Sequence, residues 1–358
     1  MAEKEIKLMK GNEVIAHAAI RYGCDAYFGY PITPQSEVME TLMELKPWET
    51  TGMVVLQAES EISSINMVYG GAATGKRVMT SSSSPGISLM AEGLSYIAGA
   101  ELPCLIVNCQ RGGPGLGTIQ PSQGDYFQAC KGGGHGDYHM IVLAPASVQE
   151  MADLTVKAFT LADQYRMTAM ILADGTMGQM MEPVSLDLEI PPVPDKPWAT
   201  TGTQCKRKHN IINSLSLVPE ELEQLNRARY AKYAEIERSE VLVEEYMMDD
   251  AEYCIVAFGI AARVSKNAIA EARKAGIKVG LIRPITLWPF PTEAIARAAD
   301  RVKQFVSVEL SMGQMIEDVR LAVNGKAPVT LCSRVGGMIP SPDEVLAAVT
   351  AAAGKEGC

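Results

Sequence analysis

Residues 77–107 read Arg-Val-Met-Thr-Ser-Ser-Ser-Ser-Pro-Gly-Ile-Ser-Leu-Met-Ala-Glu-Gly-Leu-Ser-Tyr-Ile-Ala-Gly-Ala-Glu-Leu-Pro-Cys-Leu-Ile-Val. Apolar runs at 77–79 and 104–107 flank a segment, 87–100, whose apolar side chains recur at helical spacing. A strand, a helix and a strand in this order form a βαβ unit, in which the two strands are parallel. This stretch therefore predicts an α/β fold with a parallel sheet.

The same alternation extends through the first half of the chain, with further strands expected at 53–56, 140–143 and 169–172 and further helices at 61–70 and 148–165. The alternation stops near Glu182-Pro183, where five prolines within 183–197 indicate an extended connector. Residues 218–246 follow, with apolar positions three and four apart among many charges. This pattern predicts one exposed helix or a pair of helices.

A second alternating block begins after Asp249-Asp250. Its strands are expected at 253–258, 277–282, 305–308 and 328–332, and its helices at 262–275, 292–300, 314–323 and 342–353. A chain of 358 residues favours two domains over one. We therefore predict two doubly wound parallel-sheet domains, at 1–185 and 250–358, joined by a proline-rich connector and charged helical segment at 186–249.

Composition excludes several classes of protein. The net charge is −10 and the lysines and arginines are scattered, so nucleic acid is not an expected partner. The longest apolar stretch, 87–107, contains Glu92, Glu101 and Pro103, and Met-Ala-Glu-Lys at the start has no apolar signal core. No membrane span is expected. The eight cysteines include no C-x-x-C, which predicts reduced thiols, a cytoplasmic location and no iron–sulfur cluster on this chain.

Four short motifs lie where apolar runs meet glycine, proline or serine: Gly29-Tyr-Pro-Ile-Thr-Pro34, Gln57-Ala-Glu-Ser-Glu61, Ser81-Ser-Ser-Ser-Pro-Gly86 and Arg111-Gly-Gly-Pro-Gly115. In an alternating α/β chain such loops follow strands, and open parallel sheets bind ligands at that end. The four loops are therefore expected to form one site. Thr33 itself has two readings. It could cap a helix that Pro34 starts, or its hydroxyl could face a ligand, and the residues alone favour the cap.

Glu59 and Glu61 follow a strand that reads as buried and open the next helix. A carboxylate in a first helical turn is stabilised by the helix dipole by about 0.3–1 kcal/mol, which suffices to explain one of the two. The serine run, taken alone, reads as a connecting loop. Arg111 offers a planar fork that suits a carboxylate, and its glycines let the backbone approach a ligand. No nucleotide-binding fingerprint is present.

Two metal sites are considered and set aside. Cys130, His135 and His139 have a spacing compatible with zinc, but they offer three ligands around three consecutive glycines, so this loop is instead expected to pack over the active site. Ala173-Asp174-Gly175 is the nearest string to the Gly-Asp-Gly motif for Mg²⁺ and diphosphate that the family resemblance described below implies, and no suitable asparagine follows before Asn210. No metal ligand is therefore assigned to this chain.

In their order and spacing the four motifs resemble the alpha subunit of 2-oxoacid:ferredoxin oxidoreductases, and the resemblance covers nearly the whole chain. It is closest to the 2-oxoisovalerate, or branched-chain, type. It implies a domain that binds the pyrimidine of thiamine diphosphate and a second domain like the C-terminal domain of transketolase. The motifs Arg283-Pro-Ile-Thr-Leu-Trp-Pro-Phe-Pro291 and Glu309-Leu-Ser-Met-Gly-Gln-Met315 carry the second part of the resemblance; Trp288 and Phe290 are assigned no chemistry.

The resemblance also implies roles for individual residues. Glu61 matches the carboxylate that activates the cofactor, with Glu59 as the alternative two residues away. Thr33 and Arg111 match residues that bind the 2-oxoacid. Pro31, Ile32, Ser84 and Pro85, together with Glu61, are expected to line the cofactor.

The implied enzyme is a complex. Thiamine diphosphate would be shared with a beta subunit that holds Mg²⁺ and a [4Fe-4S] cluster. Gamma and ferredoxin-like delta subunits, ferredoxin and coenzyme A as cosubstrate complete it. Two alternatives stay open: a 2-oxoglutarate-specific relative, and a subunit that only scaffolds its partners. The first would need an extra buried cation for the second carboxylate.

Overall fold

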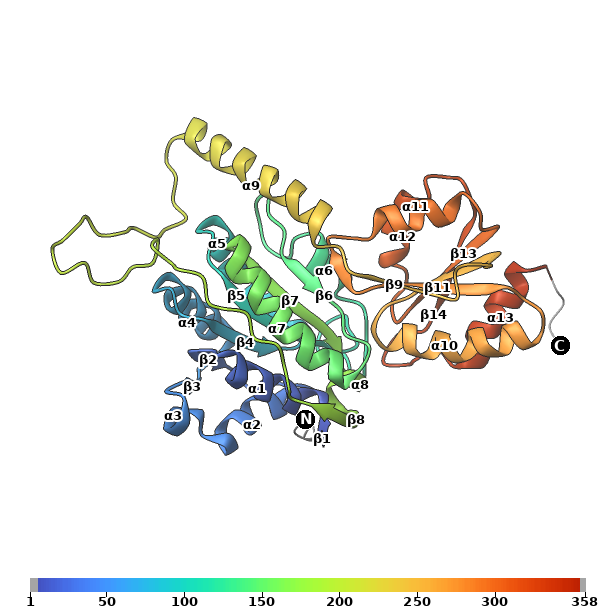
Figure 1. The fold of residues 1–358 in the computed structure, drawn as a ribbon, viewed down its shortest axis with the longest axis horizontal. Helices are drawn as coiled ribbons and strands as arrows, with labels where there is room; N and C mark the ends of the chain where they lie inside the picture. The colour runs from blue at the N-terminus through green and yellow to red at the C-terminus, as the bar shows by residue number, and fades with distance from the viewer. Residues whose placement is uncertain (1–5, 355–358) are drawn as a thin grey trace.

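The computed structural model describes residues 6–354 of the chain. Residues 1–5 and 355–358, with Cys358 among them, lie outside the described part. A sheet of seven strands forms the centre of the first half (Figure 1). The order of its strands is β12-β6-β7-β5-β4-β2-β3. Every neighbouring pair is parallel except β12 with β6. The strands are β2 (Ala26–Gly29), β3 (Val54–Gln57), β4 (Val78–Ser82), β5 (Cys104–Gln110), β6 (Ile141–Leu143), β7 (Thr168–Asp174) and β12 (Thr286–Trp288).

Helices cover both faces of this sheet, as a doubly wound fold requires. One face is covered by α1 (Gly11–Tyr22) and α7 (Val148–Tyr165), and the other by α4 (Glu61–Ala73) and α5 (Ser84–Gly99). The short elements are α2 (Ser36–Leu45), α3 (Pro47–Thr50), α6 (Tyr126–Cys130) and α8 (Gly175–Gln179). A separate antiparallel pair joins β1 (Ile6–Lys10) to β8 (Met181–Ser185).

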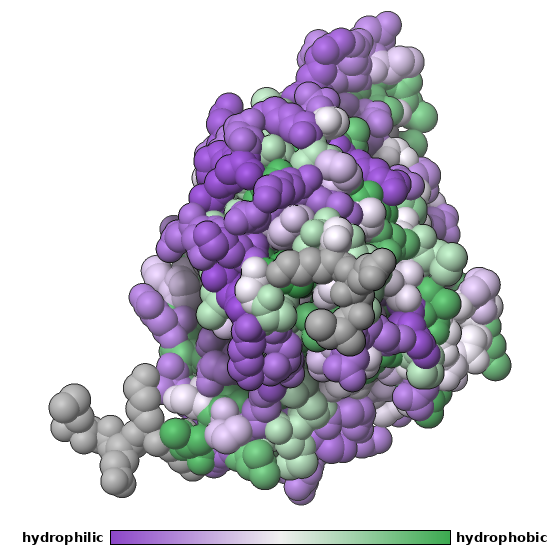
Figure 2. All heavy atoms as spheres, turned by 90° about the vertical axis from the view of Figure 1, so that its right-hand side faces the viewer, coloured by the Kyte–Doolittle hydropathy of each residue, from purple (hydrophilic) through white to green (hydrophobic). Residues whose placement is uncertain are grey.

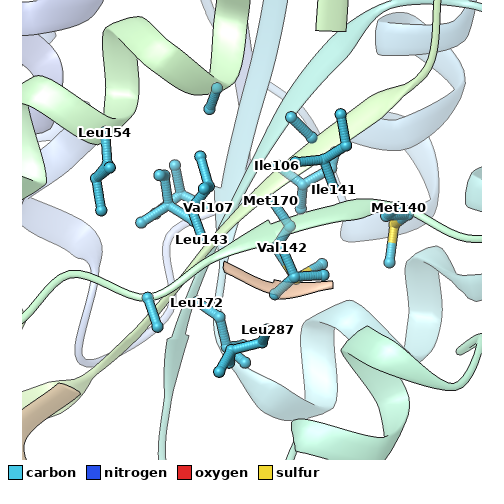
Figure 3. Packing of buried hydrophobic residues seen from close by; sticks show 14 of the residues in the cluster. Ile106, Val107, Met140, Ile141, Val142, Leu143, Leu154, Met170, Leu172 and Leu287 are labelled. Atoms are coloured by element: carbon cyan, nitrogen blue, oxygen red, sulfur yellow. The ribbon is translucent and has the colours of Figure 1, made fainter. Parts of the chain in front are cut away.

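The central strands are buried on both faces and hold the core. All seven residues of β5 and all seven of β7 are buried, as continuous apolar runs in a parallel sheet should be. Figure 3 shows Ile106 and Val107 of β5 packed with Met170 and Leu172 of β7 and with the strand β6. Leu287 of β12 joins this core, so a strand from late in the sequence completes the first sheet.

The second half forms a five-stranded sheet in the order β14-β13-β10-β11-β9, with only β9 antiparallel among them. Helices α10 and α13 pack together, and α11 and α12 pack together, on this sheet. In Figure 2, hydrophilic side chains cover a broad part of the face that this half presents. Its elements are β9 (Val243–Tyr246), β10 (Tyr253–Val256), α10 (Gly259–Lys274), β11 (Val279–Pro284), α11 (Thr292–Ala299), β13 (Gln304–Glu309), α12 (Met315–Val323), β14 (Val329–Ser333) and α13 (Pro342–Ala352).

The predicted class of two doubly wound parallel-sheet units is confirmed, and several local predictions are wrong. The segment 218–246 is the exposed helix α9 (Pro219–Ser239) followed by a strand, because Val-Glu-Glu-Tyr at 243–246 pairs with β11 instead of continuing the helix. The strand before Glu59 lies at the edge of the sheet and is largely exposed. The serine run is not a connecting loop, since Ser81 and Ser82 belong to β4 and Ser84 begins α5.

Ion pairs join the connector to the first half of the chain and join the two halves to each other. Asp163, buried on α7, pairs with the guanidinium of Arg77 (2.8 Å) and with the ammonium of Lys196 in the connector (2.6 Å). Arg283 of β11 donates two hydrogen bonds to Glu150 of α7, at 2.9 and 2.7 Å, and one to Glu244 of β9 at 2.6 Å. A bidentate arginine of this kind fixes both distance and orientation. It joins three segments that are far apart in the sequence.

Candidate active site

The N-terminus of α5 is the point where the predicted loops meet. The hydroxyl of Ser84, the first residue of this helix, accepts the backbone N–H of Arg111 at 3.1 Å. On the other side of the same turn, Gly86 lies against Glu61. A Cβ atom at Gly86 would stand 2.7 Å from Oε1 of Glu61 and closer still to the hydroxyl of Ser82. Only glycine fits here, because any side chain would displace the carboxylate.

Arg111 is 7% exposed and has no carboxylate partner among the described residues. Its terminal nitrogens donate to the backbone carbonyls of Thr33 (3.0 Å) and Leu116 (3.2 Å). Its Nε is buried and unbonded. Because a buried guanidinium is normally paired with an anion, this arrangement leaves a charge and a donor for an anionic ligand. Thr33 and Arg111, predicted to act together, are in direct contact.

Thr33 does not cap a helix, so the capping reading is wrong. Helix α2 begins at Ser36 with Gln35 at the cap position and no side-chain capping bond. Thr33 is exposed on a cleft of about 600 Å³, and its neighbours Pro31 and Ile32 are exposed and half-buried. The residues around the cleft are Thr33, Pro34, Glu37, Ile119, Gln120, Pro121, Gly175, Thr176, Gln179 and Met180.

A buried hydrogen-bond chain that the sequence analysis missed holds this loop. The hydroxyl of Ser81 donates to Oε1 of Gln35 (2.5 Å) and lies 2.7 Å from the hydroxyl of Tyr27. The amide of Gln35 donates to the carbonyl of Tyr30 at 3.3 Å. Asn12 fixes the far end by donating to the carbonyl of Pro34 at 2.7 Å. Polar residues inside apolar strands and helices were the available signal, because such groups persist only when they are bonded.

Glu61 and Glu59 differ sharply in environment. Glu61 is the first residue of α4, is 6% exposed and accepts no hydrogen bond from the residues that the structure describes. Glu59 is exposed. Ser60 provides the helix cap, since its hydroxyl accepts the N–H of Ser63 at 3.2 Å. Capping therefore does not require either glutamate, and the buried carboxyl group of Glu61 is left for another partner.

Unsatisfied polar atoms gather at this end of the sheet. The hydroxyl of Ser82, Oδ1 of Asn108 and Nε of Arg111 are buried without a partner. Ser82 and Asn108 are neighbours in register on β4 and β5, and Arg111 follows directly after β5. Buried polar groups in folded proteins are normally bonded, so this cluster indicates a polar ligand. Ser84 and Pro85 are half-buried beside it.

Asp174 caps a helix and contacts the second half of the chain. Its carboxylate caps α8 by accepting the N–H groups of Thr176 (2.9 Å) and Met177 (3.0 Å), and it also accepts the N–H of Ile260 from α10. Burial raises the pKa of Asp174 to about 6, although these backbone bonds act in the opposite direction. The carboxylate therefore links the two halves of the chain.

This pKa predicts a dependence of stability on pH. An unfolded aspartate titrates near pH 4, so between about pH 4 and 6 the folded state holds a proton that the unfolded state has released. The protonated Asp174 side chain therefore contributes to the free energy of unfolding below pH 4. This contribution, roughly 3 kcal/mol, is lost as pH rises through 6. Asp174→Asn should gain about this much stability relative to wild type between pH 4 and pH 7. Urea unfolding at both pH values measures it; an unchanged difference, as expected for the exposed control Asp195→Asn, would contradict this role.

The cysteine and histidine loop holds no zinc site. Within residues 6–354, no group of three His, Cys, Asp or Glu side chains is arranged to bind a metal ion. The ring of His139 stacks on Trp288 at 4.8 Å, and burial lowers the pKa of His139. The carbonyl of His135 instead accepts the hydroxyl of Ser95, in the C-terminal half of α5. The loop thus packs away from Thr33 and Glu61, contrary to the expectation that it covers the active site.

The seven described cysteines are free, and five of them are buried. Across residues 6–354, no helix has both the length and the apolar content needed to cross a bilayer.

Comparisons with known proteins show the family of this chain. A family model described as "Pyruvate flavodoxin/ferredoxin oxidoreductase, thiamine diP-bdg" matches residues 17–245, and one described as "Pyruvate:ferredoxin oxidoreductase core domain II" matches residues 251–345. The ketoisovalerate oxidoreductase subunit VorB of Methanothermobacter thermautotrophicus is 50% identical over 97% of this chain and 98% of its own. The 2-oxoglutarate synthase subunit KorA of Methanothermobacter marburgensis is 36% identical over 94% of this chain and 96% of its own.

A solved structure, the 2-oxoglutarate:ferredoxin oxidoreductase from Magnetococcus marinus with 2-oxoglutarate, coenzyme A and succinyl-CoA bound, has a TM-score of 0.87 and 26% identity. It is matched over 98% of this chain and 66% of that longer chain. The first family model alone spans more than half of the sequence. The chain therefore belongs to the 2-oxoacid:ferredoxin oxidoreductase family, as a subunit that carries the thiamine diphosphate-binding domain.

Proposed function

We propose that this chain is the alpha subunit of a complex that oxidatively decarboxylates a branched-chain 2-oxoacid, with 2-oxoisovalerate as the first candidate. The products would be CO₂, an acyl-CoA and reduced ferredoxin. The observation that carries the proposal is that two buried charged side chains lie on either side of the N-terminus of α5. Glu61 has no hydrogen-bond partner and Arg111 has no carboxylate partner among the described residues. A subunit that only scaffolds its partners would need neither group.

The residues fit thiamine diphosphate on its pyrimidine side. The bound cofactor supplies a nucleophilic carbon for the substrate carbonyl and accepts the electrons that decarboxylation releases. Glu61 would hold a proton between its carboxyl group and a ring nitrogen of the aminopyrimidine, and burial excludes water from that contact. Pro31, Ile32, Ser84 and Pro85 would border the cofactor.

The substrate would lie between Arg111 and Thr33. The Arg111 guanidinium would bind the 2-oxoacid carboxylate through its fork of donors, and the exposed hydroxyl of Thr33 would contact the carboxylate and carbonyl. Of the described residues that line the adjoining cleft, none is a lysine or arginine, and Glu37 is acidic. A second substrate carboxylate would find no lysine or arginine in that lining, and the ammonium of Lys10 beside it is already paired with Glu37 at 3.5 Å, which favours a branched-chain acid over 2-oxoglutarate.

Exposed apolar side chains lie on the elements near Glu61. Six of them, each 37–51% exposed, are on β3, on α4, which begins at Glu61, and on α5: Val54, Leu56, Ile62, Met67, Leu89 and Tyr96. An exposed apolar patch of this kind marks a protein interface. We assign it to a beta subunit that holds the diphosphate, Mg²⁺ and a [4Fe-4S] cluster, with gamma and delta subunits and ferredoxin receiving the electrons. A cytoplasmic location and the boundaries 1–185, 186–249 and 250–358 belong to the same proposal.

Substrate-dependent viologen reduction by the purified complex tests the function. With coenzyme A present, 2-oxoisovalerate should give the highest kcat/KM in a panel that includes pyruvate and 2-oxoglutarate. A complex that prefers 2-oxoglutarate would overturn the assignment of substrate. A complex that fails to reduce viologen with every 2-oxoacid in the panel would overturn the assignment of function.

Arg111→Lys should raise the KM for the 2-oxoacid and lower kcat/KM, because an ammonium cannot reproduce the two-pronged contact. Hydrogen bonds to charged groups are worth about 1.5–3 kcal/mol, so a loss of roughly 10- to 100-fold is expected. The same assay measures it. Arg227→Lys, on the exposed helix α9, is the matched control and should behave like wild type. Kinetics of the Arg111 variant equal to that control would show that Arg111 is not the clamp.

A further inference from the structure

The segment Pro121-Ser-Gln-Gly-Asp125 runs from the Arg111 loop to α6 and is bound by the second half of the chain. Gln123, 1% exposed, donates its backbone N–H to the carbonyl of Leu310 (3.0 Å) and accepts the N–H of Leu310 at its Oε1 (3.1 Å). Its amide nitrogen donates to the carbonyl of Phe258 at 2.9 Å. Leu310 and Phe258 follow β13 and β10, so the ends of these two strands fix the position of the segment.

Gln314 also holds this segment by hydrogen bonds. Its amide donates to the carbonyl of Gly124 (2.7 Å) and its Oε1 accepts the N–H of Phe127 (2.8 Å). Gln314 is itself held, because its backbone N–H donates to the buried carboxylate of Glu309 at 2.9 Å. Asp125 therefore lies between residues on both sides that the second half of the chain holds.

Asp125 faces away from these contacts, toward the candidate site. Its Oδ2 accepts the hydroxyl of Ser84 at 2.6 Å and the amide of Asn108 at 2.9 Å. Its backbone N–H donates to Oε1 of Gln110 at 3.0 Å. The carboxylate thus joins the N-terminus of α5 to the end of β5.

Ser84 passes this contact on to Arg111. A hydroxyl has one proton, and the short distance to a carboxylate directs the proton of Ser84 to Asp125. The oxygen of Ser84 is then free to accept the backbone N–H of Arg111 at 3.1 Å. Replacing the carboxylate would leave the carbonyl of Arg111, at 3.2 Å, as the acceptor for that proton, so Ser84 and the backbone of Arg111 would no longer be tied to Asp125.

We propose that Asp125 is a positioning residue: through Ser84 it sets the backbone of Arg111, and the second half of the chain sets the place of Asp125. The inference rests on the proposed function, in which Arg111 binds the 2-oxoacid carboxylate. The second half of the chain would then influence substrate binding without contacting the substrate, because it positions Asp125. The proposed effect on substrate binding acts through Arg111, so its signature is kinetic coupling between the two residues.

The test is a double-mutant cycle of Asp125→Ala and Arg111→Lys in the assembled complex, followed by 2-oxoacid-dependent viologen reduction. Asp125→Ala alone should lower kcat/KM for the 2-oxoacid by about 10-fold or more, mainly through KM, because a charge-assisted hydrogen bond is lost. In the Arg111→Lys background the same change should cost less than about 3-fold, since contacting or coupled residues are not additive. The exposed Asp195→Ala is the matched control and should behave like wild type.

Asp125→Asn keeps the shape and one acceptor oxygen, so it should retain several-fold more activity than Asp125→Ala and covers the case in which the alanine variant does not assemble. An unaltered KM in both variants, or a full effect of Asp125→Ala in the Arg111→Lys background, would overturn the inference. The wild-type complex in the same assay distinguishes failure of this inference from failure of the proposed function. If the wild-type complex turns over a 2-oxoacid but Asp125 and Arg111 show no coupling, only this inference is wrong. If it turns over no 2-oxoacid, the proposed function is wrong and the inference with it.

Discussion

Glu61→Gln is expected to lower 2-oxoacid-dependent viologen reduction by about 10²–10⁴-fold, the range typical for loss of a positioned general acid or base. Glutamine keeps the size and shape of the side chain but cannot hold or release a proton. The site should otherwise persist, because Ser60 and not Glu61 caps α4 and because Gly86 leaves the same space. Loss of a charge from a first helical turn costs only about 0.3–1 kcal/mol of stability.

The matched control is Glu59→Gln, two residues earlier and exposed. It should retain activity within about a factor of two, since surface substitutions usually change stability by less than about 0.5 kcal/mol. Both variants should assemble with their partners and lose no more than about 1 kcal/mol of stability in urea unfolding. Loss of activity in the Glu59 variant alone would place the functional carboxylate two residues away from the one proposed.

Asp163→Asn is expected to lower the free energy of unfolding by about 3–5 kcal/mol, because it leaves two cations buried without a counter-charge. The side chains of Arg77 and Asp163 are each 4% exposed, and that of Lys196 is 9% exposed. Such a pair need not stabilise the fold relative to an apolar core, but breaking it is costly. Arg77 also stacks on Tyr22, with its guanidinium carbon 4.0 Å from the ring centre, and cannot turn to solvent without losing that contact.

Urea unfolding followed by circular dichroism measures the change. Asp153→Asn lies on the same helix, is exposed and bonds only Gln149, so it should change the free energy of unfolding by less than about 0.5 kcal/mol. Because Lys196 belongs to the connector, Asp163→Asn should also make the connector more sensitive to proteolysis. Two variants of equal stability would show that the buried pair contributes nothing to the fold.

The sequence predicted the two sheets well because their strands are apolar runs of the kind that buried parallel strands require. β5 and β7 are examples, since each has every residue buried. It failed where pairing and not burial makes the strand. Val243–Tyr246 carries two glutamates and reads as a helix, yet its backbone completes the edge of the second sheet. β12 is three residues long and joins a sheet built more than a hundred residues earlier.

The candidate site shows the same division. Arg111 stands out in the sequence as a charged residue directly after a strand, whereas the choice of Glu61 over Glu59 came from the family resemblance. The contacts of Gln123 and Asp125 could not be predicted, because Gln123 bonds Leu310 and Asp125 bonds Ser84, which are distant in the sequence. Composition misled at the serine run, which reads as a flexible loop but ends a buried strand, since the hydroxyl of Ser81 is bonded to Gln35 and Tyr27.

Proton–deuterium exchange at C2 of the thiazolium ring, measured in the assembled complex without substrate, decides whether Glu61 activates the cofactor. This measurement reports the action of Glu61 on the cofactor before any substrate, coenzyme A or electron acceptor takes part. If Glu61 has this role, exchange slows by at least about 10²-fold in Glu61→Gln and stays at the wild-type rate in Glu59→Gln. Wild-type exchange in both variants would contradict it.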